Sequence, residues 1–277
     1  EYLQRYRAAD MPLPRFRDSD IERQRAFAVI DQQTKQADDP RVRKTIVPVS
    51  ADDHDAIASA HNDYDALEVK ANYYAMIMLI DDQFKRIIDT LRDTRQLDNT
   101  IIVYMSDHGE LLGDHGLILK GCRFFEGLVH IPMIFSWPDR FQRNLQSDAL
   151  VESVDVAPTL LEAAGLKPAP GSTLDGRSLI PLFEQKPGFD RDAIFFHYPN
   201  YAFHKKNRLG SALRAGNFKL ITYYDNGEFE LYRLSSDIGE EVNLSQQHPE
   251  IVRQLKDKLD AWLRQTDARL PVRKATK

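Results

Sequence analysis

The segment TIIVYMSDHGELLGDHGLILKG, residues 100–121, starts as an apolar run and then becomes polar. The run 100–105 predicts a buried strand. Asp107 and His108 follow where that strand would end, and Lys120 lies near the end of the segment. In open parallel α/β sheets, ligands bind beyond the carboxyl ends of the strands. The segment therefore predicts both a strand of such a sheet and a functional site at its end.

The flanking sequence predicts helices that alternate with strands. Apolar residues recur at three- and four-residue steps over 67–91, which is the period of an amphipathic helix. A second apolar run, 131–137, predicts another buried strand, and 153–164 predicts a helix that ends at Gly165. This alternation favours strands that run parallel with helices on both faces. We therefore expect an α/β fold with a mixed, mainly parallel sheet flanked by helices.

The carboxy-terminal third has a different pattern. Short apolar segments are separated by turn residues, and the pair Asn226-Gly227 is typical of a type I′ hairpin turn. Pro249 opens a closing amphipathic helix. We expect a small antiparallel sheet with one helix, its strands lying at 211–214, 218–224 and 229–234.

A Pro- and Gly-rich stretch, 168–188, predicts a domain boundary. Residues 1–187 would form the large α/β part, in which 1–60 is an irregular excursion across the surface. Residues 188–277 would form a small α+β subdomain.

The composition excludes several classes of protein. The 277 residues carry a formal net charge of -5, which gives no support for binding to nucleic acid. No apolar run approaches the roughly 18 residues that a membrane span needs. Cys122 is the only cysteine, so the chain has no intrachain disulfide and no cysteine-based metal cage. The chain opens on Glu1 rather than Met, and we expect that a segment precedes it.

The residues after the first strand allow two interpretations. Adjacent residues at a turn can direct a carboxylate oxygen of Asp107 and an imidazole nitrogen of His108 at one cation. Alternatively, Ser106 or Asp107 caps a following helix and His108 is exposed. Lys120 would either face an anionic substrate oxygen beside the metal or be an ordinary solvated lysine.

The string Ser-Asp-His-Gly-Glu-x-x-Gly-Asp-His-Gly-x-x-x-Lys-Gly, followed by Phe124–Gly127 and Ile131–Ile134, resembles the second half of a type I sulfatase. This formylglycine-dependent family belongs to the alkaline-phosphatase-like superfamily. Further similarity extends over most of the chain from about residue 60, in 75–83, 154–160, 175–179, 211–221 and 230–232. The resemblance implies an alkaline-phosphatase-like fold and a sulfuric ester hydrolase.

The resemblance also implies roles for individual residues. Asp107 and His108 fall on the pair that ligates one divalent ion, usually Ca²⁺, with Mg²⁺ or Mn²⁺ as alternatives. Lys120 falls on the catalytic lysine that contacts the sulfate. Arg123 would contact substrate or be structural.

The sequence departs from the family pattern at the nucleophile. Formylglycine is made from Cys or Ser in a Cys/Ser-x-Pro-Ser/Ala-Arg motif, which is absent, as are two further aspartate ligands and the leaving-group histidine. Cys122 lacks the required proline and is rejected as the nucleophile. We therefore expect the carboxy-terminal portion of a longer polypeptide, whose amino-terminal half supplies the formylglycine and acts as partner. Asp114 and His115 are expected to shape the loop between the metal and Lys120 or to support the metal ligands, with direct ligation as the less favoured alternative.

Residues 196–208 are rich in aromatic and basic side chains, among them His197, His204 and Lys205. In sulfatases this region lines the mouth of the pocket. Aromatic rings would stack on a sugar and cations would bind neighbouring sulfates, so a sulfated carbohydrate is the expected substrate. A solvated basic loop explains the same composition equally well.

Two other functions remain open. The chain could belong to a phosphonate or phosphate ester hydrolase of the same superfamily; the two-zinc branch is disfavoured because no histidine has an aspartate four residues before it. It could also be a non-catalytic fragment that only binds, since two ligands alone would hold Ca²⁺ poorly. The resemblance favours a periplasmic, secreted or lysosomal location.

Overall fold

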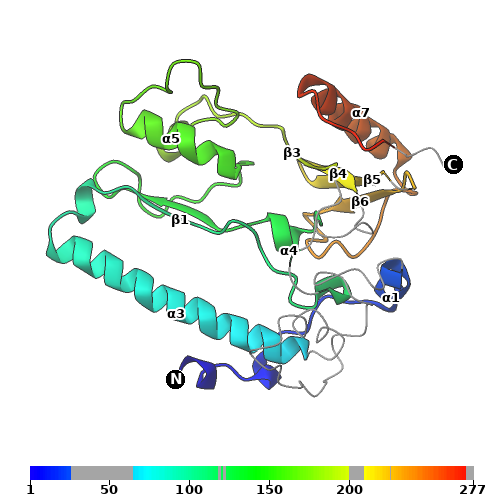
Figure 1. Ribbon diagram of the computed structural model, residues 1–277, viewed down its shortest axis with the longest axis horizontal. Coiled ribbons are helices and arrows are strands. Elements are labelled where there is room, and N and C mark those ends of the chain that lie inside the picture. Colours follow the sequence, from blue (N-terminus) through cyan, green and yellow to red (C-terminus); the bar gives the residue numbers. More distant parts are fainter. Residues whose placement is uncertain (26–64, 118–119, 121–122, 200–208, 225, 273–277) are drawn as a thin grey trace.

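The structure is a computed structural model that describes residues 1–25, 65–117, 120, 123–199, 209–224 and 226–272. Figure 1 shows two parts side by side: a long helix with a two-stranded sheet and a shorter helix, and a four-stranded sheet covered by the last helix. The amino-terminal segment contains the short elements η1 (Tyr2–Gln4), η2 (Ala8–Asp10) and α1 (Asp18–Arg25).

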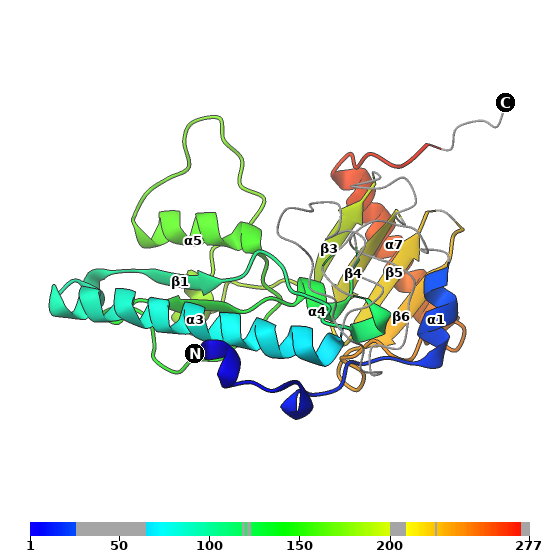
Figure 2. The ribbon, with the colours of Figure 1, turned by 60° about the horizontal axis from the view of Figure 1, so that its bottom comes forward.

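Helix α3 (Ala66–Asp93) confirms the helix predicted from the three- and four-residue period. Asp65 caps the start of the helix. Its carboxylate accepts hydrogen bonds from the amides of Leu67 and Glu68, two of the N–H groups that have no partner within the first turn. Phe84 on the helix packs against Tyr104 on the first strand, with ring centroids 5.3 Å apart. Figures 1 and 2 both show α3 running alongside that strand.

The two predicted strands are β1 (Ile102–Met105) and β2 (Met133–Ser136), and they pair antiparallel. The expectation that they run parallel is wrong. A parallel pair needs a crossover that carries the chain back to the start of the first strand. Among the described residues of this connection, the only elements are η5 (Asp114–Gly116) and α4 (Glu126–Val129), and β2 starts opposite the end of β1. The fold is a mixed α/β fold, as predicted.

On the opposite side of β1 and β2 from α3 lies α5 (Val156–Ala163), preceded by η6 (Ser153–Asp155), which together match the predicted helix. The short elements η4 (Leu97–Asn99) and α6 (Ile180–Phe183) complete this part.

The small antiparallel sheet has the order β3-β4-β5-β6 and is followed by α7 (Pro249–Gln265). Its strands are β3 (Ala193–Tyr198), β4 (Gly210–Ala215), β5 (Phe218–Tyr223) and β6 (Phe229–Arg233). The three predicted strands and the helix are confirmed. Strand β3 adds a fourth that the turn pattern did not mark.

Residues of this sheet alternate between two cores. Leu213, Leu220 and Leu231 pack with α7, whereas Ala212 and Ile221 face the other way. On that second face the sheet packs against the connection between β1 and β2, through the buried residues Leu111, Leu117, Phe124, Phe125 and Leu128. One face of the small sheet is therefore fixed to the loop that follows β1.

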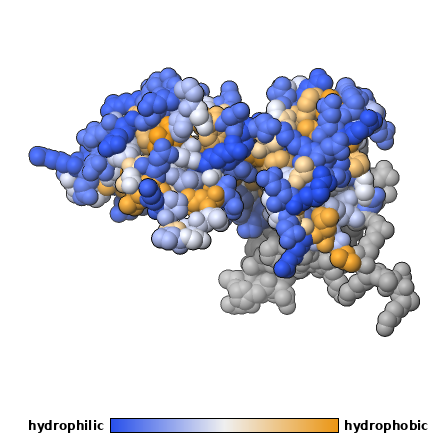
Figure 3. All heavy atoms as spheres, turned by 90° about the horizontal axis from the view of Figure 1, so that it is seen from above, coloured by the Kyte–Doolittle hydropathy of each residue, from blue (hydrophilic) through white to orange (hydrophobic). Residues whose placement is uncertain are grey.

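The surface is mainly hydrophilic with apolar patches on both halves (Figure 3). Helix α3 contributes exposed large apolar side chains at Met76, Ile77, Leu79, Ile80 and Ile87. Across the described ranges, no helix has the length and apolar character that crossing a bilayer requires.

Candidate functional site

The polar segment after β1 forms a turn rather than a helix. The Ser106 hydroxyl donates to the backbone oxygen of His108 at 2.7 Å, and the His108 amide donates to Oδ1 of Asp107 at 2.9 Å. The next helical element starts only at Asp114. Capping of a following helix therefore does not explain these residues, and the turn presents the Asp107 and His108 side chains together.

The tautomer of His108 follows from its neighbours. Its Nδ1 lies 2.8 Å from the backbone oxygen of Gly109, and a carbonyl can only accept, so Nδ1 carries the proton. In the neutral ring, Nε2 then has the free lone pair. The ammonium nitrogen of Lys120 lies 2.8 Å from Nε2, and Oδ2 of Asp107 lies 3.5 Å from it. The structure thus brings the three predicted residues together.

Asp107 is ionised at neutral pH. The hydrogen bond from the His108 amide has the largest effect and lowers the pKa of its carboxyl group; partial burial raises the pKa by less, and the nearby ammonium of Lys120 adds a small further lowering. Its side chain is 85% exposed, so its oxygens remain accessible to a ligand.

The donor set fits a divalent cation in part. A carboxylate oxygen of Asp107 and Nε2 of His108 are suitable donors for one ion. The carbonyl of Gly109 orients the imidazole as a ligand-orienting group does. Lys120 has to move away from Nε2 before an ion binds there. Within the described residues no group of three or more His, Cys, Asp or Glu side chains is arranged to hold a metal.

Asp107, His108 and Lys120 open into a cavity of about 750 Å³. Its walls also include Arg123 from the same loop, Arg214 from β4, and the β3 side chains Phe196 and Tyr198. Arg123 is almost fully buried, so it lies at the inner wall of the cavity. The cavity size is that of an ordinary small-ligand site.

His197 does not lie in this cavity. Successive side chains of a strand point to opposite faces, so Phe196 and Tyr198 line the cavity and His197 points towards α7. Both ring nitrogens of His197 are engaged there, Nδ1 with the Ser211 hydroxyl at 2.7 Å and Nε2 with the backbone oxygen of Arg269 at 2.9 Å. His204 and Lys205 lie outside the described residues, as does Cys122.

Asp114 and His115 connect the loop to the amino-terminal segment. Asp114 accepts a hydrogen bond from the Arg15 amide at 2.9 Å, and the His115 amide donates to the Arg15 backbone oxygen at 2.8 Å. The buried His115 ring stacks on Phe125 with centroids 3.9 Å apart. These contacts attach the amino-terminal segment to the loop.

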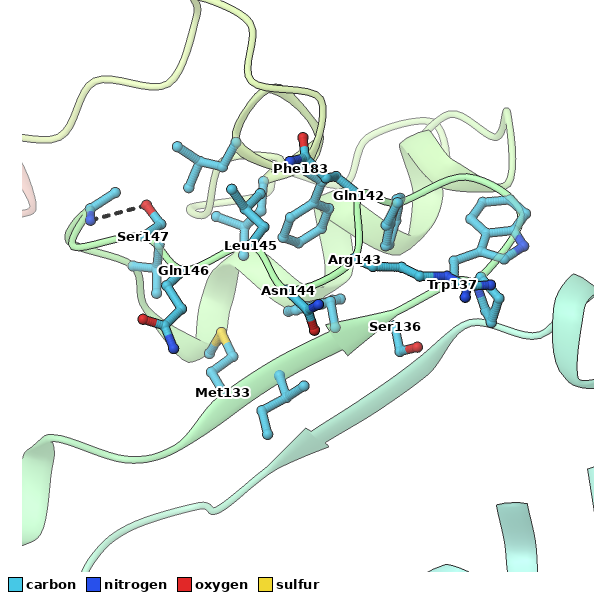
Figure 4. A pocket seen from close by; sticks show the side chains of 18 of the residues that line it. Met133, Ser136, Trp137, Gln142, Arg143, Asn144, Leu145, Gln146, Ser147 and Phe183 are labelled. Atoms are coloured by element: carbon cyan, nitrogen blue, oxygen red, sulfur yellow. Dashed lines mark hydrogen bonds between the residues drawn. The ribbon is translucent and has the colours of Figure 1, made fainter. Parts of the chain in front are cut away.

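A second cavity, of about 910 Å³, lies beside β2 (Figure 4). Its wall includes Ser136, which opens the sequence Ser-Trp-Pro-Asp-Arg (136–140), a partial match to the nucleophile motif that has Asp at the fourth position. Ser136 is paired with Ile102 at the start of β1, whereas Asp107 follows its end. The partial motif therefore lies at the far end of the strand pair from Asp107.

Sequence reasoning missed two cavity residues, Glu126 and Arg214. Their side chains form an ion pair at 3.4 Å although they are separated by 88 positions in the chain. Both residues lie in segments that resemble the family, 124–127 and 211–221, but nothing in the sequence indicates that they pair, so only the three-dimensional fold reveals the ion pair.

Two sequence families match the chain. The family described as "Sulfatase" covers residues 15–166, and "N-sulphoglucosamine sulphohydrolase, C-terminal" covers 113–265. The fold is that of the alkaline-phosphatase-like hydrolases. Each of these matches spans more than half of the 277 residues, and the chain belongs to the sulfatase family.

Individual proteins agree with this assignment. A sulfatase of Formosa agariphila is 30% identical over 78% of the chain and 44% of its own length. An N-acetylglucosamine-6-O-sulfatase of Bacteroides thetaiotaomicron is 35% identical over 62% of the chain and 31% of its own length. The chain thus spans between about a third and a half of these curated relatives.

Two solved structures are similar as well. One, in complex with its substrate D-glucosamine-2-N,6-O-disulfate, has a TM-score of 0.67 at 30% identity, covering 75% of this chain and 42% of that one. A phosphonate monoester hydrolase of Agrobacterium radiobacter has a TM-score of 0.72 at 26% identity, covering 95% of this chain and 53% of that one.

Proposed function

We propose that the chain carries part of the active site of a sulfatase that hydrolyses sulfate esters of carbohydrates. The observation that supports this most directly is the convergence of Asp107, His108 and Lys120 at the end of β1. The named substrates and activities of the relatives, N-acetylglucosamine-6-O-sulfate esters and a glucosamine disulfate, support a sulfated carbohydrate.

Each of the three residues has a separate role. Asp107 and His108 would hold one divalent cation, Ca²⁺ or alternatively Mg²⁺ or Mn²⁺, which would neutralise charge on the sulfate oxygens. Lys120 is the catalytic lysine: its ammonium donates to the sulfate group and stabilises charge that develops as the S–O bond to the sugar breaks. Arg123, at the inner wall, is a substrate-binding residue that keeps the anion in place. His204 and Lys205 would bind substrate at the mouth.

The nucleophile would be a formylglycine outside the 277 residues. In net hydrolysis, water supplies hydroxyl to sulfur and a proton to the departing sugar oxygen, giving an alcohol and sulfate. The apolar side chains that α3 exposes support a further part of the same polypeptide as partner. Residues 188–277 would be a small subdomain attached through the face that covers the β1–β2 connection. A periplasmic, secreted or lysosomal location fits this assignment.

A phosphonate ester hydrolase is the second candidate. The similarity to the phosphonate monoester hydrolase extends over 95% of the chain, more than the 75% covered by the structure with the disulfated sugar. The two reactions differ in the atom attacked, so one comparison of substrates separates them.

The test uses the full-length protein, checked first by intact mass for a Cys or Ser converted to formylglycine. Its kcat/KM is measured on a sulfate ester and on a phosphonate monoester with the same leaving group, with Lys120→Met as the inactive control. We expect sulfate to be preferred by at least about tenfold. A preference for phosphonate would reassign the enzyme, and turnover of neither would leave a chain that only binds.

A further inference from the structure

Arg214 places a positive charge in the cavity wall, and it comes from a different part of the molecule than Lys120. It lies in β4, where it is opposite Ile194 of β3 and Lys219 of β5. Because alternate residues share a face, Arg214 lies on the same face as Ala212, which packs against the β1–β2 connection. Lys120, by contrast, comes from the loop after β1. The cavity therefore has cationic groups on two separate elements.

Glu126 fixes the position of Arg214. One oxygen of Glu126 lies 3.4 Å from Nη1 of Arg214, and the other lies 2.9 Å from the ammonium of Lys219. Lys219 is fully buried and also lies 2.9 Å from Glu240, whose second oxygen accepts a hydrogen bond from the Glu126 amide. Glu126 is thus held at both its backbone and its side chain. A buried charge fixed in this way is a rigid support for the guanidinium beside it.

The Glu126 carboxylate cannot satisfy Arg214 fully. It is shared with Lys219 and with His130, whose Nδ1 lies 3.2 Å away. Nε of Arg214 is buried without a hydrogen-bond partner among the described residues, and a quarter of the side chain remains exposed on the cavity side. Buried N–H donors normally have acceptors. Nε is closed off from solvent, so an anion in the cavity would meet only the exposed part of the Arg214 side chain.

We propose that Arg214 is a specificity-determining residue that binds a second sulfate group of the sugar whose reacting sulfate lies at Lys120. The inference rests on the proposed function and names its substrate class, a carbohydrate with at least two sulfates. Nε is buried and Nη1 faces Glu126, so the guanidinium would bind the sulfate through its positive charge and through the N–H groups that remain open to the cavity. A cavity of about 750 Å³ has room for one sugar with both groups.

The test compares glucosamine carrying sulfate on N2 and O6 with the same sugar carrying either sulfate alone. In the full-length wild-type protein, kcat/KM for the disulfated sugar should exceed that for each of the two monosulfated sugars by tenfold or more. Arg214→Gln should remove this preference while changing kcat/KM for the monosulfated sugar by less than about threefold. Arg214→Lys keeps the charge beside Glu126 and should restore only part of the preference.

Arg233→Gln on β6 is the matched control, because this arginine lies over the Phe218 ring and does not line the cavity. Equal losses on all sugars in the Arg214 variants, or no preference in the wild type, would overturn the inference and leave the sulfatase assignment intact. If no sulfate ester is hydrolysed at all, the proposed function fails. Calorimetric binding of the same sugars then decides whether Arg214 still selects the disulfated one.

Discussion

The ammonium nitrogen of Lys120 lies 2.8 Å from Nε2 of His108, the ring nitrogen that would coordinate a metal. The lone pair on that nitrogen can accept a hydrogen bond from Lys120 or bind a cation, but not both. Ion binding at His108 and the position of Lys120, the proposed catalytic lysine, are therefore coupled. A bound ion would release Lys120 into the cavity, where a sulfate would replace His108 as its partner.

Replacing Lys120 should have opposite effects on activity and on ion binding. In Lys120→Met we expect kcat/KM for a sulfate ester to fall by a factor of about 100 or more, the usual loss when one charge-stabilising donor is removed. The affinity for Ca²⁺ or Mn²⁺ should increase, because neither a hydrogen bond nor a positive charge then competes at His108. Steady-state kinetics and calorimetric titration measure the two effects on the same preparation.

The matched control is Lys186→Met, which removes an exposed lysine paired with Glu184 on the surface. Both quantities should stay within about twofold of the wild type. A Lys120→Met variant that bound the ion more weakly would show that Lys120 supports the ion site rather than competing with it.

Asp107 should contribute most of the negative charge that attracts the ion. We expect Asp107→Asn to weaken Ca²⁺ binding by at least about tenfold, and the isolated 277-residue chain to bind only in the millimolar range, since hard cations need six or more oxygen ligands. Titration of chelator-treated protein measures this. Asp98→Asn is the control. This exposed carboxylate lies at the opposite end of β1, so its removal should leave the ion affinity unchanged. Equal affinity in Asp107→Asn and the wild type would exclude Asp107 as a ligand.

Local sequence patterns predicted the parts of this fold that depend on nearby residues. The period of apolar residues predicted α3 within two residues at each end, and the turn residues predicted three strands of the small sheet. Strand direction was not predictable in this way. Two apolar runs such as β1 and β2 look the same whether they pair parallel or antiparallel, and the direction depends on the path of the connection.

The candidate site shows the same limit. Asp107, His108 and Lys120 lie within one segment, and the sequence indicated that they belong together. His197 was grouped with its neighbours by composition, but the alternation of β3 turns it away from the cavity. Arg214 could not be predicted, because its place in the cavity depends on an ion pair with a residue far along the chain.

Gly109 should be essential to the shape of the turn. A Cβ added there would lie 1.9 Å from the backbone oxygen of Gly127, and its own amide donates to the Leu128 oxygen at 2.8 Å. Gly109→Ala must therefore push the turn away from α4, which displaces His108. We expect a loss of about 1–3 kcal/mol in unfolding free energy, as for other overpacked sites, and weaker ion binding.

Gly127→Ala tests the same contact from its other side. The nearest atoms to a Cβ at Gly127 are 3.8 Å away, so this variant has room and should match the wild type in ion affinity. Denaturant unfolding and ion titration of both variants decide the matter. If Gly109→Ala behaves like Gly127→Ala, the close approach between the turn and α4 does not position His108.

The buried pair of Asp155 and Arg191 should make stability depend on pH. Burial alone would raise the pKa of Asp155, but hydrogen bonds from the Arg191 guanidinium and from the amides of Arg177 and Glu152 outweigh it and lower the pKa. The Asp155 side chain is fully buried. A carboxyl group whose pKa is lower in the folded state stabilises the protein above its unfolded value of about 3.9, and this stabilisation is lost as the pH falls through the folded pKa.

Arg191→Met should therefore cost about 3–5 kcal/mol in unfolding free energy at pH 7, because it leaves a buried carboxylate without its cation. The difference from wild type should shrink as the pH falls, because Asp155 becomes neutral first in the folded variant, which lacks the cation, and then in the folded wild type. Urea unfolding between pH 3 and 8 measures this, with the exposed Arg253→Met on α7 as a control that should follow the wild type. A loss in Arg191→Met that stays constant across this range would assign the cost to lost packing rather than to the Asp155 charge.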